Sequence, residues 1–143
     1  MRNTRVLIVD DEQEFAKSLA ERMETRGLVT DTVFSGEEAI EHVKAHHFDA
    51  VVLDMAMPGM DGIETMKAML AINADLQVIV LTGHATVSTG VTAVKEGAFE
   101  FLEKPVKLET LVGKIDQAKS RSSALSEAHM VDMIDEIIKR RGW

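Results

Sequence analysis

The sequence predicts an α/β fold in which helices doubly wind a five-stranded parallel sheet, with one extra C-terminal helix. Short apolar runs rich in β-branched residues are typical of strands that are covered on both faces. These runs alternate with segments of helical period, which favours right-handed βαβ crossovers. With 143 residues, the chain suits one domain and little more.

Five runs are the expected strands. Four are continuous and end at polar residues: Arg5–Val9, Ala50–Leu53, Gln77–Leu81 and Phe99–Leu102. The fifth, Leu28–Phe34, alternates only roughly and follows Gly27. The runs are too short to be buried helices, so we predict strands.

Five helices are expected between and after these strands. The first carries the stripe Phe15, Leu19 and Met23, and Gly27 is its expected stop. Ser35 is the expected N-cap of the second, with Glu38 three residues later. The remaining three are expected around Ile63–Leu70, Thr86–Glu96 and Leu108–Ala118.

The fourth helix has a weak intrinsic preference for helix. It carries several β-branched residues and Gly90, each costing up to about 1 kcal/mol relative to alanine. Two interpretations stand side by side. Tertiary packing overrides the weak propensity, or the helix is built to shift easily.

The composition changes after Lys119. Residues 120–126 are expected to be a loop or weak helix, and Glu127–Arg141 has the apolar spacing of a sixth, amphipathic helix. We therefore divide the chain into a domain over residues 1–119 and a linker with a C-terminal helix over 120–143. Packing on its own domain, a homodimer contact and a contact with another protein are all considered for this helix.

Composition excludes several classes of function. The formal net charge of −8 argues against a nucleic-acid or anionic-membrane surface. The absence of cysteine removes disulfides, thiolate catalysis and cysteine–zinc sites. Neither a signal peptide nor a membrane span is expected, so the default location is cytoplasmic.

Polar residues gather at the ends of the expected strands. Asp10 and Asp11 follow the first, Asp54 follows the third, Thr82 the fourth and Lys104 the fifth. In a doubly wound sheet these ends face one crevice. Clustered carboxylates favour a hard cation such as Mg²⁺, and one carboxylate left to attack phosphorus beside a lysine suits phosphoryl transfer.

Four segments carry a resemblance to a known family: VLIVDDE from Val6, VVLDMAMPGMDG from Val51, VIVLTGHA from Val78 and GAFEFLEKP from Gly97. Over about residues 4–119 the sequence resembles the receiver domains of bacterial two-component response regulators, which have a flavodoxin-like (βα)5 fold. The variant GHAT after Thr82 is most similar to receivers of enhancer-binding transcriptional regulators.

The resemblance implies roles for particular residues. Asp54 is the implied phosphoacceptor, Lys104 the phosphate partner, and Thr82 with Phe101 the switch pair. The implied Mg²⁺ ligands are Asp10 (through water), Asp11, Asp54 and the carbonyl of Ala56. A cis Lys104–Pro105 peptide is implied as well. Two positions depart from the family pattern: Ala56 cannot orient a water, and Phe101 lacks the hydroxyl of tyrosine.

The resemblance also implies partners: a sensor histidine kinase or phosphotransfer protein as donor, and a downstream protein as target. No enzymatic activity is expected beyond self-catalysed phosphotransfer and autodephosphorylation. The sequence has no GxxxxGK loop and no helix-turn-helix segment, so direct DNA binding is not expected. The alternatives are a phosphorylation-independent adaptor and a receiver fragment of a longer regulator.

Two other classes fit the pattern less well. An aspartyl phosphatase normally needs a second acid two residues after its nucleophile, where this chain has Ala56. A flavodoxin-like electron carrier needs a phosphate-binding loop after the first strand, and the acidic residues there would repel a phosphate.

Overall fold

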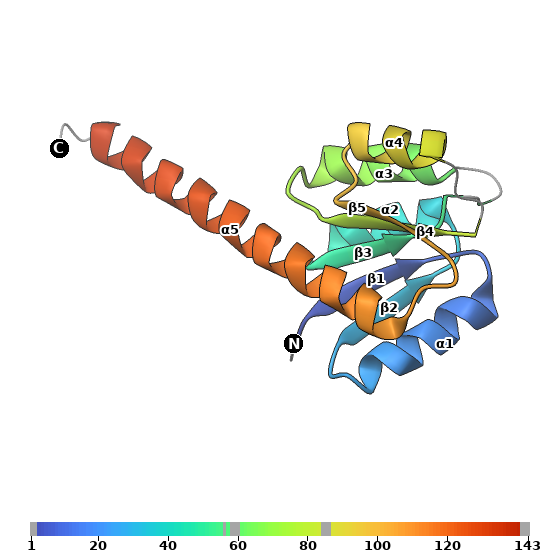
Figure 1. Cartoon of the computed structure of the whole chain (residues 1–143). Coiled ribbons are helices and arrows are strands. Elements are labelled where there is room, and N and C mark those ends of the chain that lie inside the picture. Colours follow the sequence, from blue (N-terminus) through green and yellow to red (C-terminus); the bar gives the residue numbers. More distant parts are fainter. Residues whose placement is uncertain (1–2, 56, 58–60, 84–86, 141–143) are drawn as a thin grey trace.

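The computed structural model describes residues 3–55, 57, 61–83 and 87–140, apart from the side chains of 87–89. It has a five-stranded parallel sheet in the order β2-β1-β3-β4-β5, which confirms the predicted fold class (Figure 1). The strands are β1 Arg5–Val9, β2 Val29–Val33, β3 Ala50–Leu53, β4 Val78–Thr82 and β5 Glu100–Glu103.

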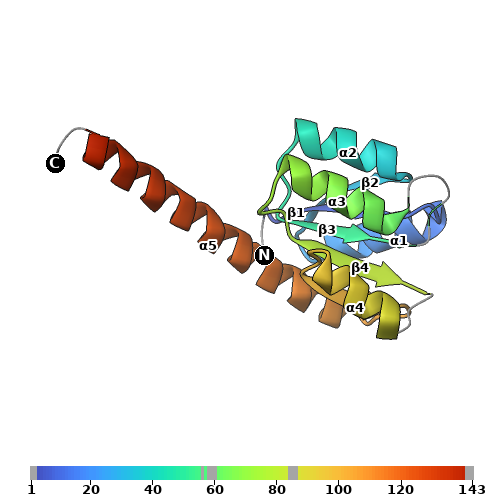
Figure 2. The same ribbon diagram turned by 90° about the horizontal axis from the view of Figure 1, so that it is seen from above.

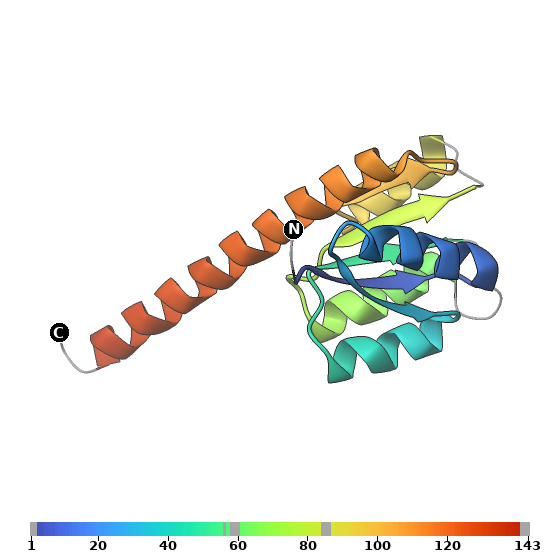
Figure 3. The same ribbon diagram turned by 90° about the horizontal axis from the view of Figure 1, so that it is seen from below.

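Helices cover both faces of the sheet. They are α1 Gln13–Glu24, α2 Gly36–Ala45, α3 Gly62–Ile72, α4 Val87–Lys95 and α5 Leu108–Arg140. Figure 2 looks onto the face covered by α2, α3 and α4, and Figure 3 onto the face covered by α1 and α5. Buried side chains divide in the same way into two cores, one on each side of the sheet.

The central strands supply both cores because successive strand residues point to opposite faces. Leu7, Val9 and Leu53 are buried on the α2–α4 side, whereas Ile8 and Val52 are buried on the α1–α5 side. This double burial explains why β1, β3 and β4 read as continuous apolar runs.

Two helix ends, at Gly27 and Ser35, confirm signals read from the sequence, and Gly97 ends a third helix in the same way as Gly27. The Ser35 side chain accepts a hydrogen bond of 3.2 Å from the Glu38 amide and caps α2. Gly27, after α1, and Gly97, after α4, have φ of 86° and 117°. Both angles lie in the left-handed region that favours glycine.

The last helix differs from the expectation of a separate sixth helix. Instead, α5 is continuous over 33 residues, from Leu108 to Arg140. Residues 120–126 extend α5 because helix propagation costs little once a turn exists, and buried Ser122 lies within this segment. Figures 1 and 3 show the second half of α5 projecting beyond the sheet.

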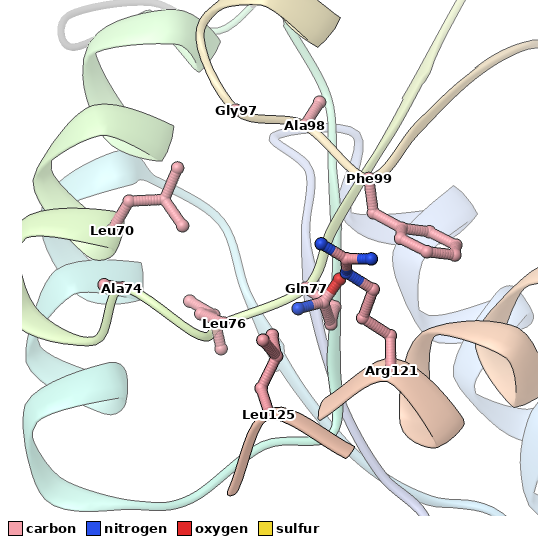
Figure 4. A pocket seen from close by; sticks show the side chains of 9 residues that line it. All are labelled: Leu70, Ala74, Leu76, Gln77, Gly97, Ala98, Phe99, Arg121 and Leu125. Carbon is pink, nitrogen blue, oxygen red and sulfur yellow. The ribbon is translucent and has the colours of Figure 1, made fainter. Parts of the chain in front are cut away.

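A pocket of about 490 Å³ marks the place where α5 leaves the body of the domain. Figure 4 shows Leu70, Leu76 and Phe99 on one side, with Arg121 and Leu125 of α5 on the other. Among the described residues, no helix is both long and apolar enough to span a bilayer.

Candidate phosphoacceptor site

The site lies at the carboxyl edge of the sheet, where main-chain hydrogen bonds fix its residues. The Asp10 amide donates to Val33 at 3.2 Å and the Asp54 amide to Val9 at 2.9 Å. The Lys104 amide donates to Thr82 at 2.9 Å. Each bond extends the pairing of two neighbouring strands by one residue. The sheet therefore fixes the main-chain positions from which these three side chains project.

Three carboxyl groups converge there. Oxygen atoms of Asp10, Glu12 and Asp54 all lie within 4.8 Å of one another. The Lys104 ammonium donates to Asp10 at 2.8 Å and lies 3.5 Å from Glu12. Asp10 and Asp54 are buried, whereas Glu12 is largely exposed. A largely buried lysine therefore balances part of a dense negative charge.

Burial raises the pKa of the Asp10 carboxyl above its ordinary value, and the nearby Asp54 charge adds to the rise. Hydrogen bonds from Lys104 and from the Glu12 amide oppose this rise but do not cancel it. Burial alone would lower the pKa of Lys104, but its contacts with Asp10, Asp54 and Glu12 outweigh burial and raise it. One ammonium thus serves three carboxyl groups. The site therefore has a deficit of positive charge.

One side of the lysine is apolar. The Lys104 ammonium lies 4.1 Å from the centroid of the Phe15 ring, at a distance typical of a cation–π contact. Phe15 is partly buried against the α1–α5 core. The ring therefore helps to hold the ammonium at the mouth of the site.

The structure brings together most of the predicted residues and adds two. Asp10, Asp54 and Lys104 meet as expected, but the group of three carboxylates contains Glu12 and not Asp11, which is half-buried nearby. Ala56 lies outside the described residues. Sequence reasoning missed Glu12 and Phe15 as parts of the site. The Glu12 amide donates to the Asp10 side chain at 2.9 Å, and this turn brings Glu12 back over the site.

The expected switch pair lies beside this cluster. Thr82 is buried at the end of β4, and Phe101 is half-buried on the neighbouring β5. Phe101 pairs in register with Val80 of β4, so both side chains lie on the same face of the sheet. Thr82 is two residues after Val80 in β4 and therefore shares that face. Gly90 of α4 fits closely over the ring: a Cβ there would lie 3.2 Å from Phe101 Cδ1. The Lys104–Pro105 peptide after β5 is cis, as expected.

The donor set fits a hard divalent cation. Among the described residues, the three that could hold a metal ion there (Asp10, Glu12 and Asp54) all offer carboxylate oxygens, the ligands that Mg²⁺ prefers. Burial is the main cause of the raised pKa of the Asp10 carboxyl, and repulsion from the Asp54 charge adds to it. A cation would relieve this repulsion, whereas a neutral ligand would not.

The order of strands and the acidic edge define a class of α/β domain that handles its ligand beyond the carboxyl ends of the strands. The chain belongs to the response regulator receiver domain family, whose model matches residues 6–116. This match confirms the resemblance carried by the four sequence segments.

Relatives within the family include longer regulators. The chain is 30% identical over 122 residues to the C4-dicarboxylate transport transcriptional regulatory protein DctD of Rhizobium meliloti, covering 85% of this chain and 26% of that protein. It is 32% identical over 132 residues to response regulator MprA of Mycobacterium ulcerans, covering 92% and 56%. The chain therefore spans about a quarter and about half of these proteins.

Solved receiver domains share the fold. A crystal structure of a response regulator receiver domain protein from Clostridium thermocellum matches with a TM-score of 0.81 and 31% identity. The match covers 85% of this chain and 98% of that one.

Proposed function

We propose that the domain is switched by phosphorylation of Asp54. The observation that carries the proposal is the convergence of Asp54 with Asp10, Glu12 and Lys104 at one edge of the sheet. In the step, a carboxylate oxygen of Asp54 attacks the phosphorus of a phosphohistidine. The oxygen–phosphorus bond forms as the nitrogen–phosphorus bond breaks, and its electron pair remains on the imidazole.

The residues of this chain supply position and charge for that step. A hydrogen bond from the Asp54 amide to the Val9 carbonyl fixes the main-chain position from which the Asp54 carboxylate projects. Lys104 is close enough to the acidic cluster to compensate the charge brought by a phosphoryl group. Thr82 ends the neighbouring strand, where its hydroxyl suits a phosphoryl oxygen. Bound Mg²⁺, held by Asp10, Asp11, Asp54 and the Ala56 carbonyl, would neutralise further charge.

The donor is proposed to be a sensor histidine kinase or a phosphotransfer protein, and the acceptor chain supplies the chemistry of its own phosphorylation and autodephosphorylation.

Output through a downstream protein is supported by the α4–β5 surface. A pocket of about 450 Å³ there is lined by Gly90, Val91, Val94, Lys95 and Phe101. Val91 and Val94 are both exposed, which is typical of a surface that another protein covers.

The direct test uses a small phosphodonor. Incubation with acetyl phosphate and Mg²⁺ is expected to add the mass of one phosphoryl group, measured by intact-protein mass spectrometry. With a chelator in place of Mg²⁺, the carboxylates and the incoming phosphate repel one another, so the added mass is expected to fall to background. Equal labelling with and without a divalent cation would contradict the proposal.

Mg²⁺ binding is expected to be weak and to depend on Asp11. The Asp11→Ala variant removes a proposed ligand, so we expect its affinity for Mg²⁺ to fall about tenfold or more. NMR shifts of the Asp54 and Lys104 amides measure the binding. Asp116→Ala, which removes an exposed carboxylate of α5, is the control and is expected to bind normally. If Glu12→Gln weakens binding and Asp11→Ala does not, the ligand set is the described cluster and Asp11 is not part of it.

Phosphorylation is expected to shift α4. Phe101 is held beneath Gly90, and α4 has a weak intrinsic helix preference, so a small difference in contact energy changes its population. Hydrogen exchange of residues 83–97 should change when beryllofluoride, a mimic of the phosphoryl group, is added to the unphosphorylated protein, whereas exchange of β1 residues should not change. Changes confined to other regions would place the output surface elsewhere.

A further inference from the structure

The pocket beside α5, of about 490 Å³, lies at the amino edge of the sheet. Gln77 and Phe99, which line it, directly precede β4 and β5, whereas Asp54 directly follows β3 at the carboxyl edge. The volume falls within the range of about 300–1,000 Å³ that is usual for small-molecule sites. The proposed phosphorylation step makes no use of this pocket.

Hydrogen bonds order the loop between α3 and β4, which forms one wall of the pocket. The Leu76 amide donates to the Asn73 carbonyl at 3.2 Å, and the Asp75 amide donates to the Asn73 side chain at 3.1 Å. The Gln77 side chain donates through Nε2 to the Asp75 carbonyl at 2.7 Å. Leu76 and Gln77 are only 4% and 7% exposed. This wall is therefore rigid before a ligand binds, which reduces the cost of ordering it.

Gln77 presents a hydrogen-bond acceptor to the pocket. Because its Nε2 donates to the Asp75 carbonyl, the orientation of the amide group is fixed. Within the described part of the chain, Gln77 Oε1 has no hydrogen-bond partner, and no fully buried side-chain oxygen or nitrogen lacks one. Oε1 is therefore reachable from the pocket that Gln77 lines. An N–H or O–H donor of a ligand would satisfy it.

The opposite wall supplies a positive charge. Figure 4 shows the Arg121 side chain extending from α5 toward the segments that carry Gln77 and Phe99. Among the described residues that line the pocket, Arg121 alone is charged. None of the ion pairs within the described ranges includes it. Its helix neighbours three and four positions away are uncharged: Gln117, Ala118, Ala124 and Leu125.

The acid in the neighbouring loop does not cancel this charge. The Asp75 carboxylate is not among the groups that line the pocket, and its Oδ2 lies 2.8 Å from Nδ1 of His129, one turn beyond Leu125. Much of the remaining lining is apolar, with Leu70 and Leu76 on one side and Leu125 on the other. The pocket therefore combines one cation, one acceptor and an apolar surface.

We propose that this pocket binds a small organic carboxylate that has an aliphatic or aromatic body and one N–H or O–H donor. The carboxylate accepts hydrogen bonds from the planar guanidinium of Arg121, whose geometry suits two parallel bonds. The donor bonds to Gln77 Oε1, and the body lies against Leu76 and Leu125. A cationic ligand would meet a like charge at Arg121, and a purely apolar ligand would leave both polar groups unpaired.

A bound acid would bridge three parts of the fold. The lining residues come from the end of α3 with the loop after it, from the segment between α4 and β5, and from α5. The ligand is therefore expected to hold α5 against the body, and hydrogen exchange of residues 117–129 should slow when it binds. The inference does not depend on phosphorylation of Asp54, because the two sites lie at opposite edges of the sheet.

NMR shifts of the full chain, followed during titration without Mg²⁺, test the binding. The probes are N-acetyl-L-leucine and indole-3-acetate, and both are expected to give saturable shifts of the Leu76, Ala98 and Leu125 amides. The neutral N-acetyl-L-leucinamide keeps the body and the N–H but lacks the carboxylate, so it should bind about tenfold more weakly or worse. The proposal is wrong if neither acid gives saturable shifts there, if the shifts are confined to the edge that carries Asp54, or if the leucinamide binds equally well.

Two variants test the residues. Arg121→Gln removes the charge from a long side chain, and the affinity for both acids should fall about tenfold or more. Leu125→Glu places a carboxylate four residues after Arg121, where it competes with the ligand for the guanidinium, and it should weaken binding as strongly. The matched control is Arg140→Gln, which makes the first change on an exposed part of α5 beyond the pocket and should bind like the parent. Parent-like binding by Arg121→Gln or by Leu125→Glu overturns the proposal.

Discussion

The Asp54→Asn variant is expected to lose phosphorylation completely. Asparagine keeps the shape of the side chain but replaces the nucleophilic carboxylate with an amide. The neighbouring acids are poor substitutes because Asp10 is held by Lys104 at 2.8 Å and by the Glu12 amide at 2.9 Å. Mass spectrometry after incubation with acetyl phosphate and Mg²⁺ should show background labelling only.

Asp116→Asn is the matched control, since it makes the same chemical change on an exposed surface of α5. It should label like the parent protein. A second, independent readout is available in the variant at position 54. The Asp54 charge contributes to the raised pKa of Asp10, so its removal should move the pKa of Asp10 down in an NMR titration. Labelling that persists at another carboxylate of Asp54→Asn would contradict the assignment.

Strand-end residues were predictable because the parallel sheet fixes them. The strands β1, β3 and β5 are followed by Asp10, Asp54 and Lys104. Main-chain hydrogen bonds to the neighbouring strands leave little freedom in the main-chain positions of these residues. Periodicity alone was therefore enough to place them at one edge.

Glu12 was harder to predict because its position depends on a turn and not on a strand. The Asp10 side chain accepts a hydrogen bond from the Glu12 amide, and this local bond decides which of the acids after β1 faces Asp54. The continuity of α5 was missed for a different reason. Serine-rich residues 120–126 have a modest helix propensity, but burial of Ser122 and the helical turns on both sides outweigh it.

Gly62→Ala is expected to be the most damaging small substitution that the structure identifies near the site. A Cβ at Gly62 would lie 2.4 Å from the Met55 Cα and 2.8 Å from the Asp54 carbonyl oxygen. Both are main-chain atoms, and the Gly62 amide also donates to the Met55 carbonyl at 3.1 Å. In Gly62→Ala, the first turn of α3 can therefore keep its place only if the main chain at Asp54 and Met55 moves.

We expect Gly62→Ala to lower the free energy of unfolding by about 2–3 kcal/mol, the usual range for overpacking against a structure that yields only in part. Gly113→Ala is the matched control. Gly113 is an exposed residue within α5, and a Cβ there meets nothing within 4 Å. Because alanine is the better helix former, this control should raise stability by about 0.5–1 kcal/mol.

Denaturant unfolding of the two variants beside the parent measures these opposite changes. Labelling by acetyl phosphate, measured where all three proteins are folded, then separates stability from site geometry. Because the clash involves the Asp54 main chain, Gly62→Ala should label more slowly than the parent, and Gly113→Ala should label at the parent rate. A stable Gly62→Ala protein that labels normally would mean that α3 can move without displacing Asp54, and that the close approach at Gly62 does not position the phosphoacceptor.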